Sequence, residues 1–252
     1  MYAFLRRPAW LALQLVVLGL VVSFLLLGRW QLDRLDERRS ENALISDRLA
    51  ADPTGWSSYS AVLPPEYTLL TVKGEFDTGE EVLLRSQVDL GRPGFDVLTP
   101  LYLDSGSTIV VNRGWVPLAL DQVPVEEATP PDGVVAVDGY VRYPLAGASA
   151  GSGSDGDSHI FARVDLDRFD LRTDGDLEPF YLELTSMKPA GGSLPVTEGL
   201  PELSDGPHLS YAVQWFAFAL VSTFGLAALI RSTARRRSRI SRREEPQQPD
   251  SW

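Results

Sequence analysis

His208 is one of only two histidines in the 252-residue chain, and its position suits it for chemistry. It follows the sequence Asp-Gly-Pro at 205–207, which is typical of a helix start, and precedes a long apolar segment. Tyr211 and Trp215 follow about one and two helical turns later. An imidazole at such a place can be an amphipathic anchor at a membrane surface, or it can ligate a metal, including haem iron. The spacing alone leaves both interpretations open.

A second group of interest is Asn112, Arg113, Gly114 and Trp115, which ends a β-branched run. One interpretation is an Asn/Gly turn in which the arginine caps carbonyl groups and the tryptophan packs into a core. The other is a partner-binding corner, because Arg and Trp are enriched at binding hot spots. The spacing favours the first interpretation, and partner binding by these four residues is the functional prediction.

Two further patterns carry little chemistry. Residues 147–151 read GASAG and match the Gly-x-Ser-x-Gly nucleophile motif, but no strand or helix pattern flanks Ser149, as that motif requires. The aspartates between 155 and 170 lack the twelve-residue spacing and terminal glutamate of a calcium loop, so we expect a solvated acidic segment. A hydrolase using Ser149 is therefore the least supported function.

Composition excludes several classes of site and partner. The chain has no cysteine, and Met187 is its sole internal methionine, so disulfides and copper or zinc sites built from soft ligands are not expected. Residues 1–8 and 231–252 carry nine arginines and three acids, a net charge of +6. The rest of the chain therefore carries a net charge of −17, which gives the total of −11. Such an acidic middle region would repel nucleic acid.

Two apolar runs, 9–27 and 209–230, are each long enough to span a bilayer, the first extending about 28 Å as a helix. A cleaved signal peptide is the alternative for the first run, but no small-x-small cleavage site follows it. Seven arginines lie between 231 and 243, which places the C-terminus in the cytoplasm. Arginines after the first run argue the other way, although acids interleave them. We expect both termini in the cytoplasm.

Between the two runs the chain alternates strand patterns with turn signals. The segments 67–76, 81–88, 95–103, 108–116, 134–143 and 180–187 are predicted strands, and 164–171 is a predicted short helix. The predicted fold class is a membrane protein in which two transmembrane helices flank a β-rich α+β extracytoplasmic domain, a small antiparallel sheet or barrel. The predicted boundaries are a cytoplasmic N-terminus at 1–8, spans at 9–27 and 209–230, and a domain at 28–208. That domain includes a helical extension at 28–51 and a flexible loop at 146–158, and an Arg-rich cytoplasmic tail occupies 231–252.

Six segments stand out in order along the chain: GRWQLDR after the first span, GEFDTGEEVLLR at 74–85, GFDVLTPL at 94–101, IVVNRGWVP at 109–117, VDGYVR at 137–142 and PHLSYAVQWFAFAL at 207–220. In this order they resemble the Surfeit locus protein 1 family. The NRGWVP and HLSYAVQW segments are the most specific. The resemblance implies an assembly factor for cytochrome c oxidase in a bacterial plasma membrane, a multi-pass protein that is not an enzyme and that acts as a chaperone of the respiratory chain.

The resemblance also implies a role for individual residues. His208 matches the family's proposed haem a ligand at the outer end of the second span, and Tyr211 and Trp215 match neighbouring positions. The expected function is assistance of haem a insertion into oxidase subunit I, with haem a bound transiently and with no copper or zinc. The expected partners are subunit I, other respiratory complex subunits and the lipid bilayer, with no nucleic acid. The alternative is a structural accessory subunit of the oxidase or a supercomplex that binds no cofactor.

Overall fold

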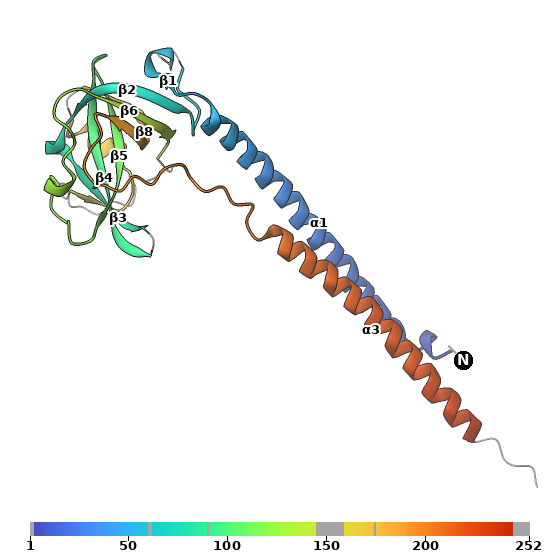
Figure 1. The fold of residues 1–252 in the computed structure, drawn as a ribbon. Helices are drawn as coiled ribbons and strands as arrows, with labels where there is room; N and C mark the ends of the chain where they lie inside the picture. The colour runs from blue at the N-terminus through green and yellow to red at the C-terminus, as the bar shows by residue number, and fades with distance from the viewer. Residues whose placement is uncertain (1–2, 60–61, 90, 145–158, 174, 244–252) are drawn as a thin grey trace, which may run out of the picture. The chain divides into compact units, whose positions relative to one another are not determined.

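The computed structural model describes residues 3–59, 62–89, 91–144, 159–173 and 175–243 (Figure 1). The chain divides into two compact units. The helical unit comprises Met1–Ala43 with Ser204–Trp252, and the sheet domain comprises Leu44–Leu203. The predicted loop at 146–158 lies outside the described residues. The ends of the predicted domain, 28–43 and 204–208, belong to the helical unit.

The helical unit contains a short 3-10 turn, Ala3–Arg6, the greater part of a long helix, α1 (Pro8–Ala50), whose last residues belong to the sheet domain, and a second long helix, α3 (His208–Arg243). Within the described residues these two helices are long and apolar enough to cross a membrane, and only 6% of each apolar window is buried. α1 continues beyond its apolar run to Ala50 and ends before Asp52 and Pro53, as predicted. α3 continues thirteen residues beyond the expected end at Ile230, because 231–243 contains neither Pro nor Gly and is rich in arginine, a good helix former.

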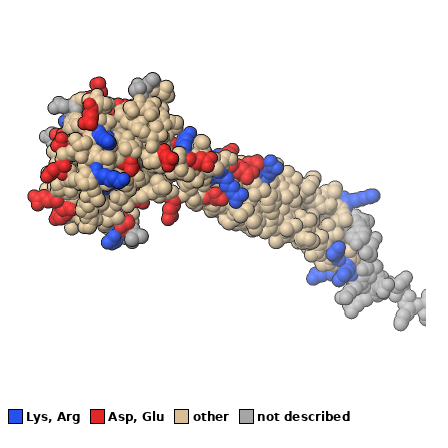
Figure 2. All heavy atoms as spheres, turned by 45° about the horizontal axis from the view of Figure 1, so that its top comes forward, with Lys and Arg blue, Asp and Glu red and all other residues tan. Residues whose placement is uncertain are grey.

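α1 and α3 pack side by side in antiparallel orientation (Figure 1). The ring of Phe24 stacks on Trp215 with centroids 5.8 Å apart. Gly28 lets the helices approach, because a Cβ there would lie 2.7 Å from the ring of Phe216. Figure 2 shows an uncharged band along these helices, with mixed charges at one end and basic side chains at the other. This pattern follows from the apolar runs and their charged flanks.

The sheet domain forms the strands that the sequence predicts. The six predicted strands are confirmed as β2 (Leu69–Phe76), β3 (Val82–Asp89), β4 (Arg92–Leu103), β5 (Ser107–Pro117), β6 (Val135–Arg142) and β8 (Asp176–Lys188). The predicted short helix is α2 (Leu166–Asp170), started by Asp165, whose side chain accepts from Arg168 N. The remaining elements are β1 (Thr54–Gly55), β7 (Ile160–Phe161) and three 3-10 turns at Trp56–Tyr59, Thr78–Glu80 and Glu126–Ala128.

In the described part of the chain these strands form one eight-stranded sheet in the order β1-β2-β6-β8-β5-β4-β3-β7. A further pairing joins β2 to β4, so hydrogen bonding runs from β2 through β6, β8, β5 and β4 and returns to β2. The expectation of an antiparallel sheet is wrong for part of it, because β5 and β8 pair in parallel, as do β1 with β2 and β3 with β7. β5 and β8 are joined by a long connection that contains β6, β7 and α2, and such a connection permits a parallel pair where a tight hairpin would not.

The core of the domain divides into three clusters of buried apolar side chains. The largest gathers residues of β2, β4, β5, β6 and β8 around Phe180, with Trp56 packed edge-on against that ring. A second packs α2 and Phe161 against β3, β4 and β5. A third lies under the 3-10 turn at Glu126–Ala128. β5 contributes to all three clusters, so the end of β5 is held on several sides.

Candidate functional site

The N-terminus of α3 is held against α1 by polar contacts that all lie within the helical unit. Arg39 Nε donates to Asp205 Oδ2 at 2.9 Å, and Asn42 Nδ2 donates to Asp205 Oδ1 at 3.4 Å. α3 begins at His208, directly after the predicted start signature. Gly206 has a φ of +68°, which glycine adopts without strain and which turns the chain into the helix. The segment before His208 is therefore tied down from two positions on α1.

The ring of His208 has a defined partner on α1. Its Nδ1 lies 2.9 Å from Oε1 of Gln31. An amide oxygen can only accept, so Nδ1 donates in this contact, and in the neutral ring Nε2 then keeps a free lone pair. A Cβ on Gly206 would lie 3.6 Å from Nε2, so the absence of a side chain there leaves space beside that edge of the ring. The imidazole is thus held at Nδ1 by Gln31, with Gly206 beside Nε2.

A cavity of about 450 Å³ lies beside this ring. Its lining consists of Arg34, Glu37, Arg38, Glu41, Ser204, Gly206, Pro207 and His208. Arg34 pairs with Glu37, and Arg38 pairs with Glu41 at 3.2 Å. All four of these charged side chains are more than half exposed, so the pairs contribute little to stability and can rearrange around a ligand. The cavity therefore offers one imidazole, two guanidinium groups and the two carboxylates that pair with them.

These residues suit haem iron better than a bare metal ion. Within the described residues, no group of three or more His, Asp or Glu side chains lies close enough together to hold an ion. A porphyrin supplies four nitrogen ligands of its own, so one protein imidazole is sufficient to attach it. Guanidinium groups pair well with carboxylates such as those that haems carry. The donor set is consistent with the expected haem ligand, with His208 as the protein's contribution.

The two aromatic residues predicted beside His208 lie differently. Tyr211 is 47% exposed, and its backbone N–H donates to Pro207 O as part of the first turn of α3. Trp215 is half-buried. Its ring stacks on Phe24 of α1 and meets Phe218 of its own helix, α3, edge-on. Neither lines the cavity. A direct role of either in cofactor binding stays a prediction, while the structure assigns Trp215 to helix packing.

The four residues predicted as a partner-binding corner lie in the interior of the sheet domain. Asn112, Arg113, Gly114 and Trp115 are all buried, Arg113 with no exposed surface at all. The pairing of β4 with β5 shifts register between Asp96 and Leu98, which places a bulge at Arg113 and Gly114. In this conformation the side chains of Asn112, Arg113 and Trp115 and the backbone of Gly114 contact the domain itself and not solvent. Partner binding stays a prediction, and it would have to act through the shape of the domain.

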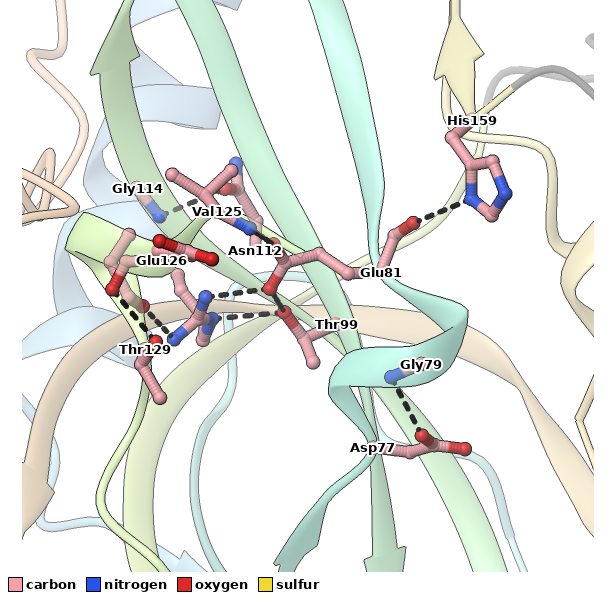
Figure 3. A network of polar contacts seen from close by, with 12 residues as sticks. Asp77, Gly79, Glu81, Thr99, Asn112, Gly114, Val125, Glu126, Thr129 and His159 are labelled. Carbon is pink, nitrogen blue, oxygen red and sulfur yellow. Dashed lines mark hydrogen bonds and ion pairs between the residues drawn. The ribbon is translucent and has the colours of Figure 1, made fainter. Parts of the chain in front are cut away.

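Arg113 is the centre of a buried polar network, shown in part in Figure 3. Its Nη2 donates to Glu81 Oε2 at 2.7 Å, its Nε to Thr99 Oγ1 at 2.9 Å and its Nη1 to Ala128 O at 2.7 Å. The other oxygen of Glu81 accepts from Val125 N at 2.8 Å. Burial lowers the pKa of Arg113, which the neighbouring Glu81 carboxylate opposes. The network joins β4, β5 and the residue just before β3 to the turn at Glu126–Ala128.

Asn112, the residue before Arg113, bridges two carboxyl groups. Its Nδ2 donates to Asp96 Oδ2 at 3.1 Å and to Glu183 Oε2 at 2.8 Å. Burial raises the pKa of Asp96 to about 7, and the nearby Glu198 adds to the rise. Burial, with the charge of Asp96 next, raises the pKa of Glu183 to about 8. Arg113 and Asn112 thus belong to two separate buried networks, and both networks hold this part of β5 in the fold.

With this geometry in view, the chain can be compared with known proteins. The model of the SURF1 family matches residues 18–220. This chain belongs to the SURF1 family. An uncharacterized SURF1-like protein of Mycobacterium tuberculosis is 30% identical over 247 residues, covering 94% of this chain and 89% of that protein. Surfeit locus protein 1 of Rattus norvegicus is 25% identical over 217 residues, covering 79% of this chain and 69% of the rat protein. A SURF1-like protein of Monosiga brevicollis is 24% identical over 208 residues, covering 78% of this chain and 79% of its own.

Membership confirms the resemblance read from the sequence, and the matched region contains α1 from residue 18 onward and the start of α3. Sequence reasoning placed His208 at a helix start but did not single out Gln31, Glu81, Asp96 or Glu183. Gln31 stood within the GRWQLDR segment, and its polar side chain just beyond an apolar run was the available signal. The buried acids had no such signal, because alternation in a strand does not tell a paired buried carboxylate from an exposed one.

Proposed function

We propose that this protein is a non-catalytic assembly factor for haem-copper cytochrome c oxidase and that it assists haem a insertion into subunit I. Membership of the SURF1 family supports the oxidase assembly role. The observation that carries the haem part is His208, held at Nδ1 by Gln31 and open at Nε2 beside a cavity with two arginines. His208 would hold the haem iron, and Arg34 and Arg38 would pair with the haem carboxylates.

A carrier must also release its cargo, and the site supports that requirement. The described residues of the cavity offer one imidazole, so the iron would have a single protein ligand there. The two cavity arginines already have carboxylate partners to which they can return when the haem leaves. Hydrogen bonds and ion pairs at such exposed positions form and break at low cost. A hold of this kind suits transfer to an apoprotein with a more complete set of ligands.

We further propose that α1 and α3 span a bacterial plasma membrane with both termini in the cytoplasm. The two helices support this by their length and apolar surface. The orientation is supported by the seven arginines between 231 and 243, which outnumber the four arginines (29, 34, 38 and 39) that follow the first apolar run.

Because the chain has no cysteine, single cysteines report topology without background. A cysteine at exposed Ser58 should react with a membrane-impermeant maleimide in intact spheroplasts, and one at Ser232 should react only after lysis. Reaction at Ser232 in intact spheroplasts would refute the orientation.

The haem proposal is tested by purifying the protein from cells that make haem a and recording its absorption spectrum. Wild-type protein should carry a haem band, and His208→Ala should lose it. His159→Ala is the matched control, because it removes the other histidine of the chain and should retain the band. Full haem occupancy in His208→Ala would remove His208 from this role. Stable co-purification with the oxidase and no haem in wild-type protein would support the accessory-subunit alternative instead.

A further inference from the structure

Gln31 is placed so that its side chain controls which nitrogen of His208 is free. It lies on α1 one turn beyond Gly28, where the apolar run gives way to charged residues. Its side chain is half-buried and reaches across to α3, where Oε1 meets His208 Nδ1 at 2.9 Å.

The contact is set by the register of the two helices and is not a chance meeting of surface side chains. Phe24 on α1 faces Trp215 on α3, seven residues before Gln31 and seven residues after His208. Seven residues are two turns of a helix, so these two contacts repeat along one seam of an antiparallel pair. Gly28 lies between them and lets α3 approach closely. The seam therefore holds Gln31 opposite His208.

We propose that Gln31 is a positioning residue for His208, whose ring it holds as the Nδ1–H tautomer with the Nε2 lone pair directed toward the cavity. This inference rests on the proposed function, in which Nε2 attaches the haem iron. Histidines that ligate metals generally donate their other ring N–H to a fixed acceptor, which sets both tautomer and ring orientation. The opposite arrangement, with Gln31 donating to Nδ1, would put the proton on Nε2 and block ligation.

An amide as the acceptor for His208 Nδ1, in place of a carboxylate, also suits a protein that binds haem and then releases it. A carboxylate partner draws the ring toward imidazolate and makes it a stronger ligand for oxidised iron. A neutral amide orients the ring without that strengthening. Gln31 is thus suited to a site that must present haem and then release it, and Gln31→Glu is expected to bind ferric haem more tightly than wild type.

The first experiment needs no haem and reads the tautomer directly. Full-length protein labelled with 15N-histidine is studied by NMR in detergent micelles at about pH 8.5, where free imidazole is neutral. Only two histidines contribute signals, and His208→Gln assigns them. In wild-type protein His208 should be protonated at Nδ1, in Gln31→Ala this preference should be lost, and in Gln31→Glu it should return. Gln14→Ala is the matched control, because Gln14 lies on the same helix but bonds only to backbone carbonyls. A proton on Nε2 in wild-type protein, or an unchanged tautomer in Gln31→Ala, would overturn the proposal.

The second experiment titrates the same purified variants with haem a. Gln31→Ala should bind about 10-fold to 100-fold more weakly than wild type, in the range found when such orienting partners are removed. Gln31→Glu should bind ferric haem a more tightly than wild type and lower the midpoint potential of the bound haem. Unchanged affinity in Gln31→Ala, with wild type binding normally, would refute the positioning role while leaving the proposed function intact. Failure of wild-type protein to bind haem would refute the proposed function, and the tautomer measurement would then decide the positioning role by itself. Unchanged His159 signals and helix content show that each variant is folded.

Discussion

Replacing Arg113 by leucine tests whether the buried network, and not merely apolar packing, holds the end of β5. Arg113 has no exposed surface and makes three hydrogen bonds, one of them in an ion pair with Glu81 at 2.7 Å. Glu81 is 1% exposed, so its carboxylate cannot recover its hydration when the guanidinium is removed. Breaking such a buried pair from one side costs about 3–5 kcal/mol. A small domain has only about 5–15 kcal/mol of stability, so this loss is large.

The double variant separates the ion pair from its surroundings. Glu81→Leu alone should cost about as much as Arg113→Leu, because it strands a guanidinium instead of a carboxylate. In the double variant neither charge remains, and the residual cost comes from backbone groups at Val125 and Ala128 that lose their partners, about 1–3 kcal/mol each. We therefore expect the double variant to be at least about 2 kcal/mol more stable than the sum of the single changes predicts.

The measurement is equilibrium urea denaturation of full-length protein in detergent micelles, followed by tryptophan fluorescence. An unchanged dependence on urea concentration would show that the same surface unfolds in each variant. Asp89→Ala is the control, because it breaks an ion pair with Arg92 whose arginine is 62% exposed, and it should cost less than about 1 kcal/mol. A cost below about 1 kcal/mol for Arg113→Leu, or strict additivity in the double variant, would refute the reasoning.

Three further outcomes are expected. Burial raises the pKa of Asp96 to about 7 and of Glu183 to about 8, so between about pH 4 and these values the folded state binds more protons than the unfolded state, and the free energy of unfolding should fall as pH rises. Asp96→Asn and Glu183→Gln should flatten that dependence in urea titrations from pH 5 to 9, and a slope unchanged by both would contradict the assignment. Gly114→Ala should cost about 2 kcal/mol or more in the same titration, because its φ is +121° and a Cβ would lie 2.3 Å from a backbone carbonyl oxygen; a cost below about 1 kcal/mol would count against the bulge. Gly28→Val should lower the yield of a disulfide between cysteines placed at the stacked-ring positions of α1 and α3, because a Cβ there lies 2.7 Å from Phe216, and Phe216→Ala should restore it; equal yields in all three proteins would refute the close contact.

Much of this fold could be predicted from local patterns. The apolar runs located both long helices, and the Asp-Gly-Pro signature placed the start of α3 at His208. Alternation and turn residues located six strands within a few residues of their true ends. These features depend on residues that are close in sequence, and the periodicity of apolar residues detects such local structure well.

The rest depends on pairs that are distant in sequence. Arg113 is of a residue type that is rarely fully buried, so the sequence left a partner-facing corner open as an alternative to a structural role, whereas Glu81 makes its complete burial possible. Gln31 and His208 meet because of the register of two helices 177 residues apart, which no local pattern encodes. The parallel pairing of β8 with β5 is likewise a choice among partners that the strand pattern leaves equal.

That pairing of β8 with β5 sets an order on biosynthesis. β8 lies between β5 and β6 and is the last of the described strands to be synthesised. Until β8 is made, the backbone N–H and C=O groups of β5 and β6 that pair with it have no strand partner. Pairs such as β4 with β5 can form as soon as their hairpin emerges, while the circuit back to β2 closes only after Lys188 is made. A nascent chain stalled before that point carries two open edges and is a natural target for quality-control proteases. Maturation of the domain is consequently a late event, completed just before α3 is synthesised.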